Sequence, residues 1–199
     1  MTVRSRVIAT TLAALAVVTT ADAQTLGTPV FTAPYRAYGQ SEFGVAFSDP
    51  GAGSAIEGHY RMALGTADLG FRVGVRDYTN SNSRLLLGVD WRQRMLDHSD
   101  DFPFDGALTL GAGLLTGDNS SLLLPAGFSM ARRILIEDSE VQLTPYLHPV
   151  VALVIGGNGD VIFGVGFGID VKVTRRLEVR VSGAMGDYDG VALGVAFLR

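Results

Sequence analysis

Hydrophobic and polar residues alternate along almost the whole chain from Ser41 to the C-terminus, with a period of two residues. This period is typical of a β-strand whose two faces meet different surroundings, and it differs from the spacing of an amphipathic helix. The clearest case has Leu69, Phe71, Val73 and Val75 on one face, with Gly70, Arg72, Gly74 and Arg76 between them. The sequence therefore predicts an all-β fold.

Clusters of turn-forming residues interrupt this alternation at regular intervals. They lie at residues 49–54, 65–67, 79–83, 97–103, 116–120, 137–139, 156–160, 174–176 and 186–190. These breaks delimit about ten strands of about 9 to 12 residues, close to the length that a tilted strand needs to cross a bilayer.

The number of large apolar side chains indicates which face of the strands points inward. About four on each strand give roughly forty in all, whereas a small closed barrel holds only about three layers of four side chains. The apolar face must therefore point outward from a barrel, or two stacked sheets must bury it between them. Glycines on the polar face favour the barrel, because glycine weakens a strand in water and suits a crowded interior. Closure also leaves no unpaired strand edge in lipid.

We therefore expect a closed antiparallel up-and-down transmembrane β-barrel of about ten strands, with eight strands as an alternative. A second interpretation is a secreted soluble β-sandwich, or a lipocalin-like carrier, with an apolar interior. The two interpretations place the same side chains, such as Phe71, Val165 and Leu193, in lipid or in a protein core.

The first 23 residues have the three parts of a secretory signal peptide. Two arginines precede an uncharged stretch over residues 7–20, and the small-residue site Ala21-Asp22-Ala23 follows. The stretch is shorter than the roughly 20 residues of a spanning helix. We expect cleavage after Ala23, an N-terminal tail over residues 24–40, and a barrel domain over residues 41–199.

Composition narrows the functional classes further. The chain is 47% hydrophobic and carries a net charge of −4, so it offers no basic surface for nucleic acid. It contains no Cys, which excludes disulfides and thiolate metal sites. Its three histidines are not accompanied by a Ser, His and Asp arrangement suited to catalysis. We expect no enzymatic activity, no metal and no cofactor.

The chain from about Ser41 to Arg199 resembles the small outer-membrane β-barrel proteins of diderm (Gram-negative-type) bacteria. The resemblance rests on the signal peptide, the absence of Cys, the even strand number, the turn at residues 174–177 and the closing strand over residues 191–197. One departure is that such chains usually end on an aromatic residue, whereas Leu198 and Arg199 follow Phe197 here.

The resemblance implies a location and partners. It implies export by the signal peptide and insertion into the outer membrane by the barrel assembly machinery, with lipid and lipopolysaccharide around the barrel. An even strand number puts both termini, and with them the tail over residues 24–40, in the periplasm. The outward-facing turns are then short, which argues against an adhesin or a receptor. A monomer is expected.

Seven acidic and seven basic residues project from the polar face into the expected lumen. They are Glu42, Glu57, Asp68, Asp90, Asp105, Asp170 and Glu178, with Arg61, Arg72, Arg76, Arg92, Arg94, Lys172 and Arg180. Isolated charges away from water are very costly, so we expect arginine–carboxylate pairs among them. Such a lumen predicts a non-enzymatic protein with either a structural role and a plugged lumen, or a narrow, porin-like pore.

Overall fold

The computed structural model describes residues 27–34, 40–51, 53–79, 81–99, 102–117, 120–156 and 159–199. Its strands are β1 (Glu42–Asp49), β2 (Ser54–Ala63), β3 (Ala67–Tyr78), β4 (Ser81–Leu96), β5 (Asp105–Thr116), β6 (Ser121–Ala131), β7 (Ile134–Leu135), β8 (Gln142–Ile155), β9 (Asp160–Lys172), β10 (Leu177–Gly186) and β11 (Gly190–Leu198). The expected signal peptide, and residues 24–26 and 35–39 of the expected tail, lie outside the described residues. The described part of the chain has no helix long and apolar enough to span a membrane.

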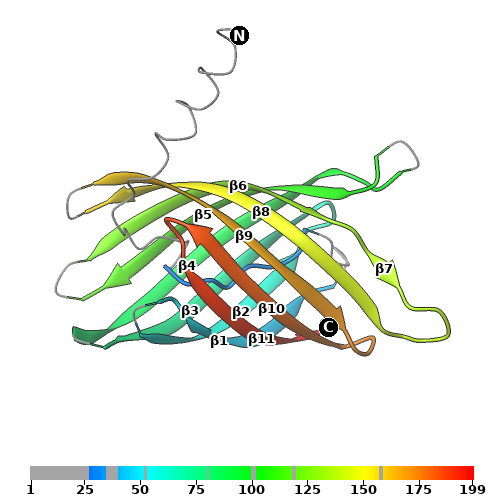
Figure 1. Ribbon diagram of the computed structural model, residues 1–199, viewed down its shortest axis with the longest axis horizontal. Coiled ribbons are helices and arrows are strands. Elements are labelled where there is room, and N and C mark those ends of the chain that lie inside the picture. Colours follow the sequence, from blue (N-terminus) through cyan, green and yellow to red (C-terminus); the bar gives the residue numbers. More distant parts are fainter. Residues whose placement is uncertain are drawn as a thin grey trace, which may run out of the picture.

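Ten strands form a closed antiparallel barrel in up-and-down order (Figure 1). Two pairings close the ring: β1 pairs with β11 along its whole length, and β6 pairs with β8. The two-residue strand β7 pairs with the start of β8, in a part of the sheet that lies beyond the closed ring. The prediction of about ten strands is confirmed, and the alternative of eight strands is wrong.

The two ends of the barrel differ. The terminal end carries the start of β1 and the end of β11, where the Ser41 N–H donates to the Arg199 carbonyl at 3.0 Å. The loop end carries the β1–β2, β3–β4, β5–β6, β8–β9 and β10–β11 turns.

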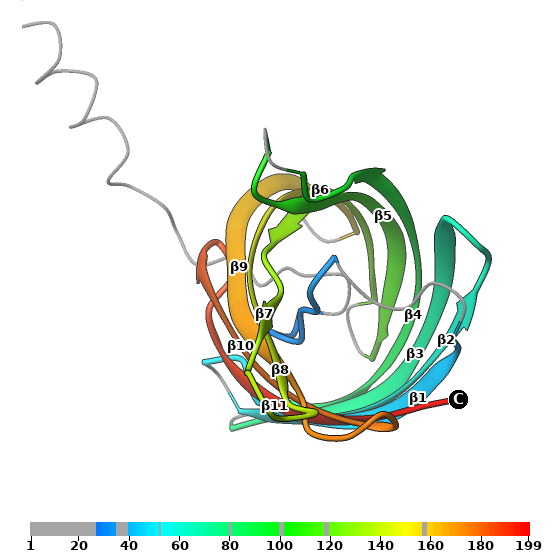
Figure 2. The same ribbon diagram turned by 90° about the vertical axis from the view of Figure 1, so that its right-hand side faces the viewer.

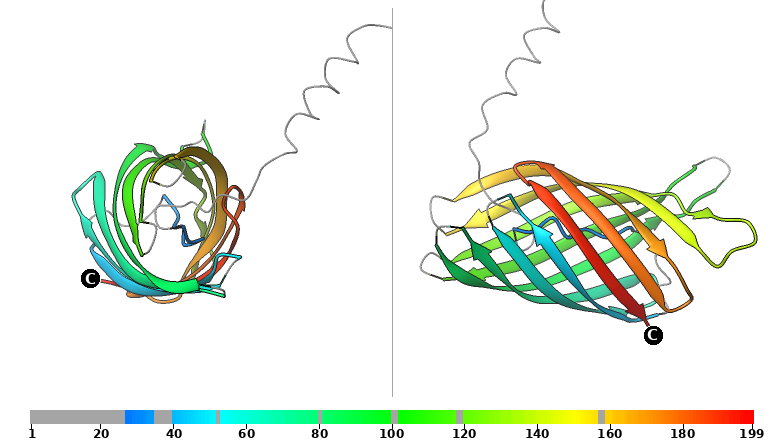
Figure 3. Two further views of the ribbon diagram at one scale, coloured as in Figure 1. Left: turned by 90° about the vertical axis from the view of Figure 1, so that its left-hand side faces the viewer. Right: turned by 60° about the horizontal axis from the view of Figure 1, so that its bottom comes forward.

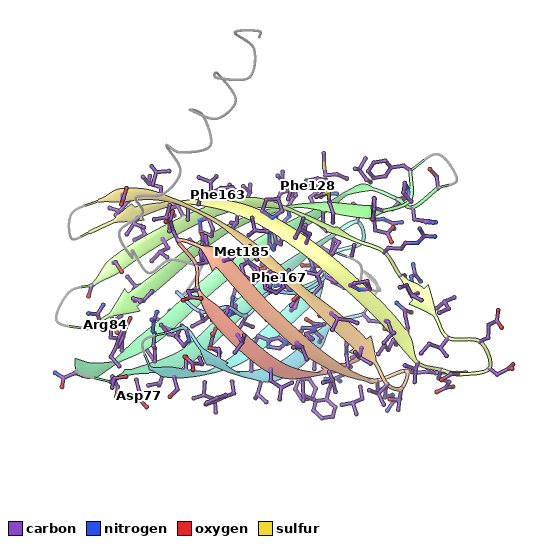
Figure 4. All side chains as sticks on the ribbon, in the orientation of Figure 1. Asp77, Arg84, Phe128, Phe163, Phe167 and Met185 are labelled. Carbon is purple, nitrogen blue, oxygen red and sulfur yellow. The ribbon has the colours of Figure 1, made fainter. Side chains whose placement is uncertain are left out.

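Side chains alternate between the two faces of each strand, as the period of two predicts. On β1, Phe43, Val45 and Phe47 are each more than half exposed on the outside. Glu42 and Ser48, on the opposite face of the same strand, are almost completely buried in the lumen. Figure 4 shows the side chains that project around the barrel. A charged interior contradicts the soluble sandwich and the lipocalin-like carrier, which both need an apolar interior.

Glycines on the inner face of β9 make room for rings that enter the lumen from elsewhere. A Cβ atom at Gly164 would lie 1.8 Å from the ring of Tyr188, and one at Gly166 would lie 2.5 Å from the ring of Phe31. Both distances are far shorter than a van der Waals contact. The rings therefore occupy the volume that a side chain on β9 would need.

Residues 27–34, which we call the lumen segment, lie inside the barrel, and for these residues this corrects the tail expected over residues 24–40. The segment (blue) crosses the lumen in Figure 2 and runs along the barrel in Figure 3. Gly27 lies beside Arg76, close to the loop end. Ala33 lies beside Asp170, close to the terminal end. The lumen segment therefore threads the barrel along its axis.

Candidate functional site

The lumen contains eight charged residues in one connected set, which we call the lumen network. Strand alternation turns each of these side chains toward the barrel axis, and the members come from β1 to β4, β9 and β10. They are Glu42, Arg61, Asp68, Asp90, Arg92, Asp170, Glu178 and Arg180.

Arg61 on β2 binds carboxylates from the next two strands. Its Nη1 lies 2.5 Å from Asp68 Oδ1, and its Nη2 lies 2.5 Å from Asp90 Oδ1. Arg92 on β4 binds the other oxygen of Asp68, with its Nη2 3.0 Å from Oδ2. The fully buried Asp68 carboxylate therefore accepts hydrogen bonds from two guanidinium groups.

Arg180 on β10 is the centre of the other half of the lumen network. Its Nη2 lies 2.7 Å from Glu42 Oε2 and 2.6 Å from Glu178 Oε1. Its Nε lies 3.8 Å from Asp170 Oδ2. Arg180 reaches Glu42 across β11, where its partner in the strand register is a glycine without a side chain to block the path. Glu42 links the two halves, because its Oε1 also lies 3.8 Å from Arg61 Nε.

These pairs are compatible with burial only because each guanidinium meets carboxylates at hydrogen-bonding distance. An ion removed from water loses several kcal/mol of hydration, which close pairing with good geometry offsets. The planar guanidinium fork suits this task, since it donates to two carboxylates at once. Removing one partner of such a pair costs about 3–5 kcal/mol, because the other charge stays buried.

Three further predicted residues point into the lumen beside this network. Arg72 on β3 pairs with Glu57 on β2, with Nη2 2.5 Å from Oε2. Arg76 is fully buried, and its Nη1 donates to the carbonyl of Gly27 at 2.6 Å. The lumen charges thus bind the lumen segment as well as one another.

The structure places Arg94, Asp105 and Lys172 at the terminal end, outside the lumen network. Arg94 pairs with Asp97, and its side chain is 38% exposed. Asp105 is the first residue of β5 and accepts a hydrogen bond from the backbone N–H of His98. Lys172 is the last residue of β9 and is half-buried. Alternation carries no information on the depth of a residue in the barrel.

Side chains of the barrel wall bind the lumen segment largely through the backbone groups of the segment. Ser182 Oγ donates to the Pro29 carbonyl at 2.5 Å. The Ala33 N–H donates to Asp170 Oδ2 at 2.9 Å, and Arg92 Nη1 donates to the Ala33 carbonyl. Two members of the lumen network therefore also bind the lumen segment.

The ring of Phe31 fills the middle of the lumen. It lies edge-on to His148 on β8 and to Tyr188 in the β10–β11 turn, with ring centroids 5.2 Å and 6.4 Å away. Such edge-to-face pairs are favourable beyond the burial of apolar area. Burial raises the pKa of the Tyr188 phenol, so this ring stays neutral. The backbone N–H of Phe31 lies 3.4 Å from Ser182 Oγ.

The space beside the lumen segment includes a small cavity. A cavity of about 80 Å³ lies next to Phe31 and is also lined by Arg72, Thr109 and His148. A water molecule needs roughly 10–15 Å³ of such space, so the cavity suits a few waters and no large solute. A cavity of this size beside Phe31 does not admit a larger solute.

No protein-family model matches the chain, and no curated protein matches its sequence. Several solved structures are similar to it at low identity. A designed transmembrane β-barrel is 14% identical, with a TM-score of 0.42, and the match covers 82% of this chain and 98% of that one. The N-terminal β-barrel domain of Pseudomonas aeruginosa OprF is 13% identical, with a TM-score of 0.40, over 81% of this chain and 98% of that one. A bacterial polysaccharide outer-membrane secretin is 14% identical, with a TM-score of 0.42, over 73% of this chain and 56% of that one.

Sequence reasoning found the charged residues but missed the lumen segment. Its contacts join residues far apart in the chain: Ala33 and Asp170 are separated by 137 positions, and Phe31 and Ser182 by 151. Such contacts leave no trace in local periodicity. One signal was present, because residues 24–34 carry no charge and include Phe31 between two prolines, which is an unfavourable composition for a tail in water.

Proposed function

We propose that the protein is a bacterial outer-membrane β-barrel without enzymatic activity, with a structural or narrow-pore role. In this proposal it is exported by its signal peptide, inserted by the barrel assembly machinery, and surrounded as a monomer by lipid and lipopolysaccharide. The observation that carries the proposal is the reversed distribution of side chains. Charges are buried along the axis, and apolar side chains are exposed around the outside.

The exposed apolar surface supports a membrane location. On β3, Phe71, Val73 and Val75 are 45%, 52% and 42% exposed, and the other long strands expose similar side chains. The largest apolar patch on a soluble monomer covers only about 300–600 Å². An apolar band that encircles the barrel is what hydrocarbon solvates, and the closed ring leaves no strand edge unpaired within it.

The geometry around His148 supports the absence of catalysis at this histidine. His148 Nε2 lies 2.8 Å from Thr109 Oγ1, which resembles the base and nucleophile of a hydrolase. A triad also needs a carboxylate to orient the histidine through its second nitrogen. Among the described residues, none hydrogen-bonds to His148 Nδ1. Thr109 and His148 instead face the small cavity beside Phe31.

The filling of the lumen supports a structural role for this state of the barrel. The lumen network crosses the interior from β4 to β10, and the lumen segment runs lengthwise beside it. The cavity beside Phe31 has room for a few water molecules. For the barrel to act as a narrow pore, the lumen network or the lumen segment must therefore move.

The fluorescence of Trp91, the single tryptophan of the chain, tests the membrane location. Trp91 lies on β4 opposite Leu69, on the face that carries the exposed apolar side chains. In liposomes we expect lipids with brominated acyl chains to quench its emission strongly, and aqueous iodide to leave it unchanged. The purified protein should also need detergent and show heat-modifiable gel mobility. Quenching by iodide but not by brominated lipid would contradict the proposal.

A further inference from the structure

We propose that the lumen wall is a binding site for an extended peptide, that the lumen segment is its resident ligand, and that release of this segment converts the closed barrel into a conducting pore. The proposal rests on the proposed function in one respect, because conductance requires a barrel that spans a bilayer. It assigns two further properties to the chain, a peptide-binding site and a gate, which do not follow from the ion pairs of the lumen network.

The wall recognises the backbone of the lumen segment. Backbone groups of the segment pair with side chains of four wall residues from four strands: Gly27 O with Arg76, Pro29 O and Phe31 N with Ser182, Ala33 N with Asp170, and Ala33 O with Arg92. Main-chain hydrogen bonds combined with a pocket for a side chain are a recurring way in which proteins bind extended peptides. Here the pocket holds the Phe31 ring between His148 and Tyr188, over Gly166.

The barrel does not need the lumen segment in order to close. Its ring is completed by the β1–β11 and β6–β8 pairings, which involve strand residues only. The charged wall residues that hold Ala33 also have partners in the wall: Arg92 pairs with Asp68, and Asp170 lies 3.8 Å from Arg180. Release of the segment therefore leaves Arg92 and Asp170 paired, which avoids the large penalty of an isolated buried ion at these two residues. Arg76 loses the Gly27 carbonyl and keeps its contact with the Tyr78 ring, whose centroid lies 4.5 Å away.

The composition of the lumen segment favours its release from the lumen. It contains no charged residue, and Pro29 and Pro34 lack the backbone N–H that would need a new partner. Proline also favours an extended backbone before binding, which lowers the entropic cost of returning to the wall. Cleavage at the expected site leaves three residues before Gly27. The segment then has a free end and can withdraw toward the terminal end.

Phe31→Ala in the full-length chain tests the gate, with conductance measured in planar bilayers. The substitution removes the ring that holds the segment and leaves every wall residue unchanged. We expect the open fraction to rise about a hundredfold, which corresponds to about 2.8 kcal/mol at 1.4 kcal/mol per factor of ten. The matched control is Phe71→Ala, since Phe71 lies on the outer face of β3, and its open fraction should equal that of the wild type. Equal open fractions for both variants would overturn the proposal.

A peptide added in trans tests the binding site. A synthetic peptide with the sequence of residues 27–34 should close the Phe31→Ala barrel in a concentration-dependent way. The same peptide with alanine in place of phenylalanine should close it far less well. Closure by both peptides alike, or by neither, would overturn the proposal that the lumen wall is a specific binding site for the lumen segment.

Thiol labelling in detergent supplies a readout that requires neither a bilayer nor a pore. Thr28 is fully buried and the chain has no cysteine, so Thr28→Cys introduces one hidden thiol. We expect a water-soluble maleimide to label it slowly, and about a hundredfold faster when Phe31→Ala is added. Ser182→Ala, which removes two contacts from the wall side, should accelerate labelling by about tenfold.

These readouts separate failure of this proposal from failure of the proposed function. Unchanged labelling in both Phe31→Ala and Ser182→Ala would show that the segment stays in place, and would overturn the gate. Faster labelling without conductance, in a barrel whose Trp91 is quenched by brominated lipid, would overturn the pore. Loss of that quenching in the wild type would contradict the membrane location itself, whatever the labelling rates.

Discussion

Arg180→Ala is expected to lower the free energy of unfolding by about 3–5 kcal/mol. The substitution leaves the carboxylates of Glu42, Asp170 and Glu178 without the guanidinium that they share. Glu42 and Asp170 are almost completely buried, so water cannot replace the lost partner without opening the barrel. Reversible urea unfolding in lipid or detergent, followed by Trp91 emission, measures the change.

Arg94→Ala is the matched control for this experiment. Arg94 pairs with Asp97 at the terminal end, where the two side chains are 38% and 61% exposed. Exposed pairs contribute at most about 1 kcal/mol, so the control should change stability by less than that. Adding Glu42→Gln to Arg180→Ala should recover part of the loss, because one orphaned charge is removed. Equal effects of Arg180→Ala and Arg94→Ala would contradict the lumen network.

Leu193→Arg should destabilise the barrel in a bilayer by about 2–4 kcal/mol. Leu193 lies in the middle of β11, is 55% exposed, and faces outward between Phe47 and Val181 of the adjacent strands. An arginine there must enter hydrocarbon if the outer face meets lipid. On a protein surface in water, the same change would alter stability by no more than about 0.5 kcal/mol. Urea titration of the liposome-embedded variant distinguishes the two results.

Leu135→Arg provides the same substitution outside the barrel ring. Leu135 lies on β7, beyond the closed part of the sheet, and is 71% exposed. We expect its stability to remain within about 0.5 kcal/mol of the wild type. If Leu193→Arg is as mild as this control, the outer face does not contact lipid.

The sequence was sufficient for the parts of the fold that depend on local pattern. Alternation on β3 placed Phe71 and Arg72 on opposite faces, and turn clusters marked most of the strand ends. The exception is β6, which ends at Ala131, well before the cluster expected at residues 137–139. The excess of apolar side chains then determined which face points outward. Up-and-down pairing follows from short turns, because each such turn joins antiparallel neighbours.

The arrangement inside the lumen depends on distant parts of the chain, and the sequence could not supply it. Arg180 and Glu42 are separated by 138 positions and meet only because β11 lies between their strands. Alternation likewise placed Lys172 on the inner face but could not reveal that it lies at the rim. The lumen segment has no periodicity at all, and its place in the barrel is set by long-range hydrogen bonds and by the glycines of β9.

The accessibility of spin labels on β1 in liposomes tests most directly whether the outer face of the barrel contacts lipid and the inner face lines the lumen. The chain has no cysteine, so single cysteines at Val45, Ala46, Phe47 and Ser48 can each carry a nitroxide. We expect high collision rates with oxygen dissolved in the bilayer at Val45 and Phe47, and low rates at Ala46 and Ser48. Equal rates at all four positions, or high rates at Ala46 and Ser48, would contradict an apolar outer face and a charged lumen.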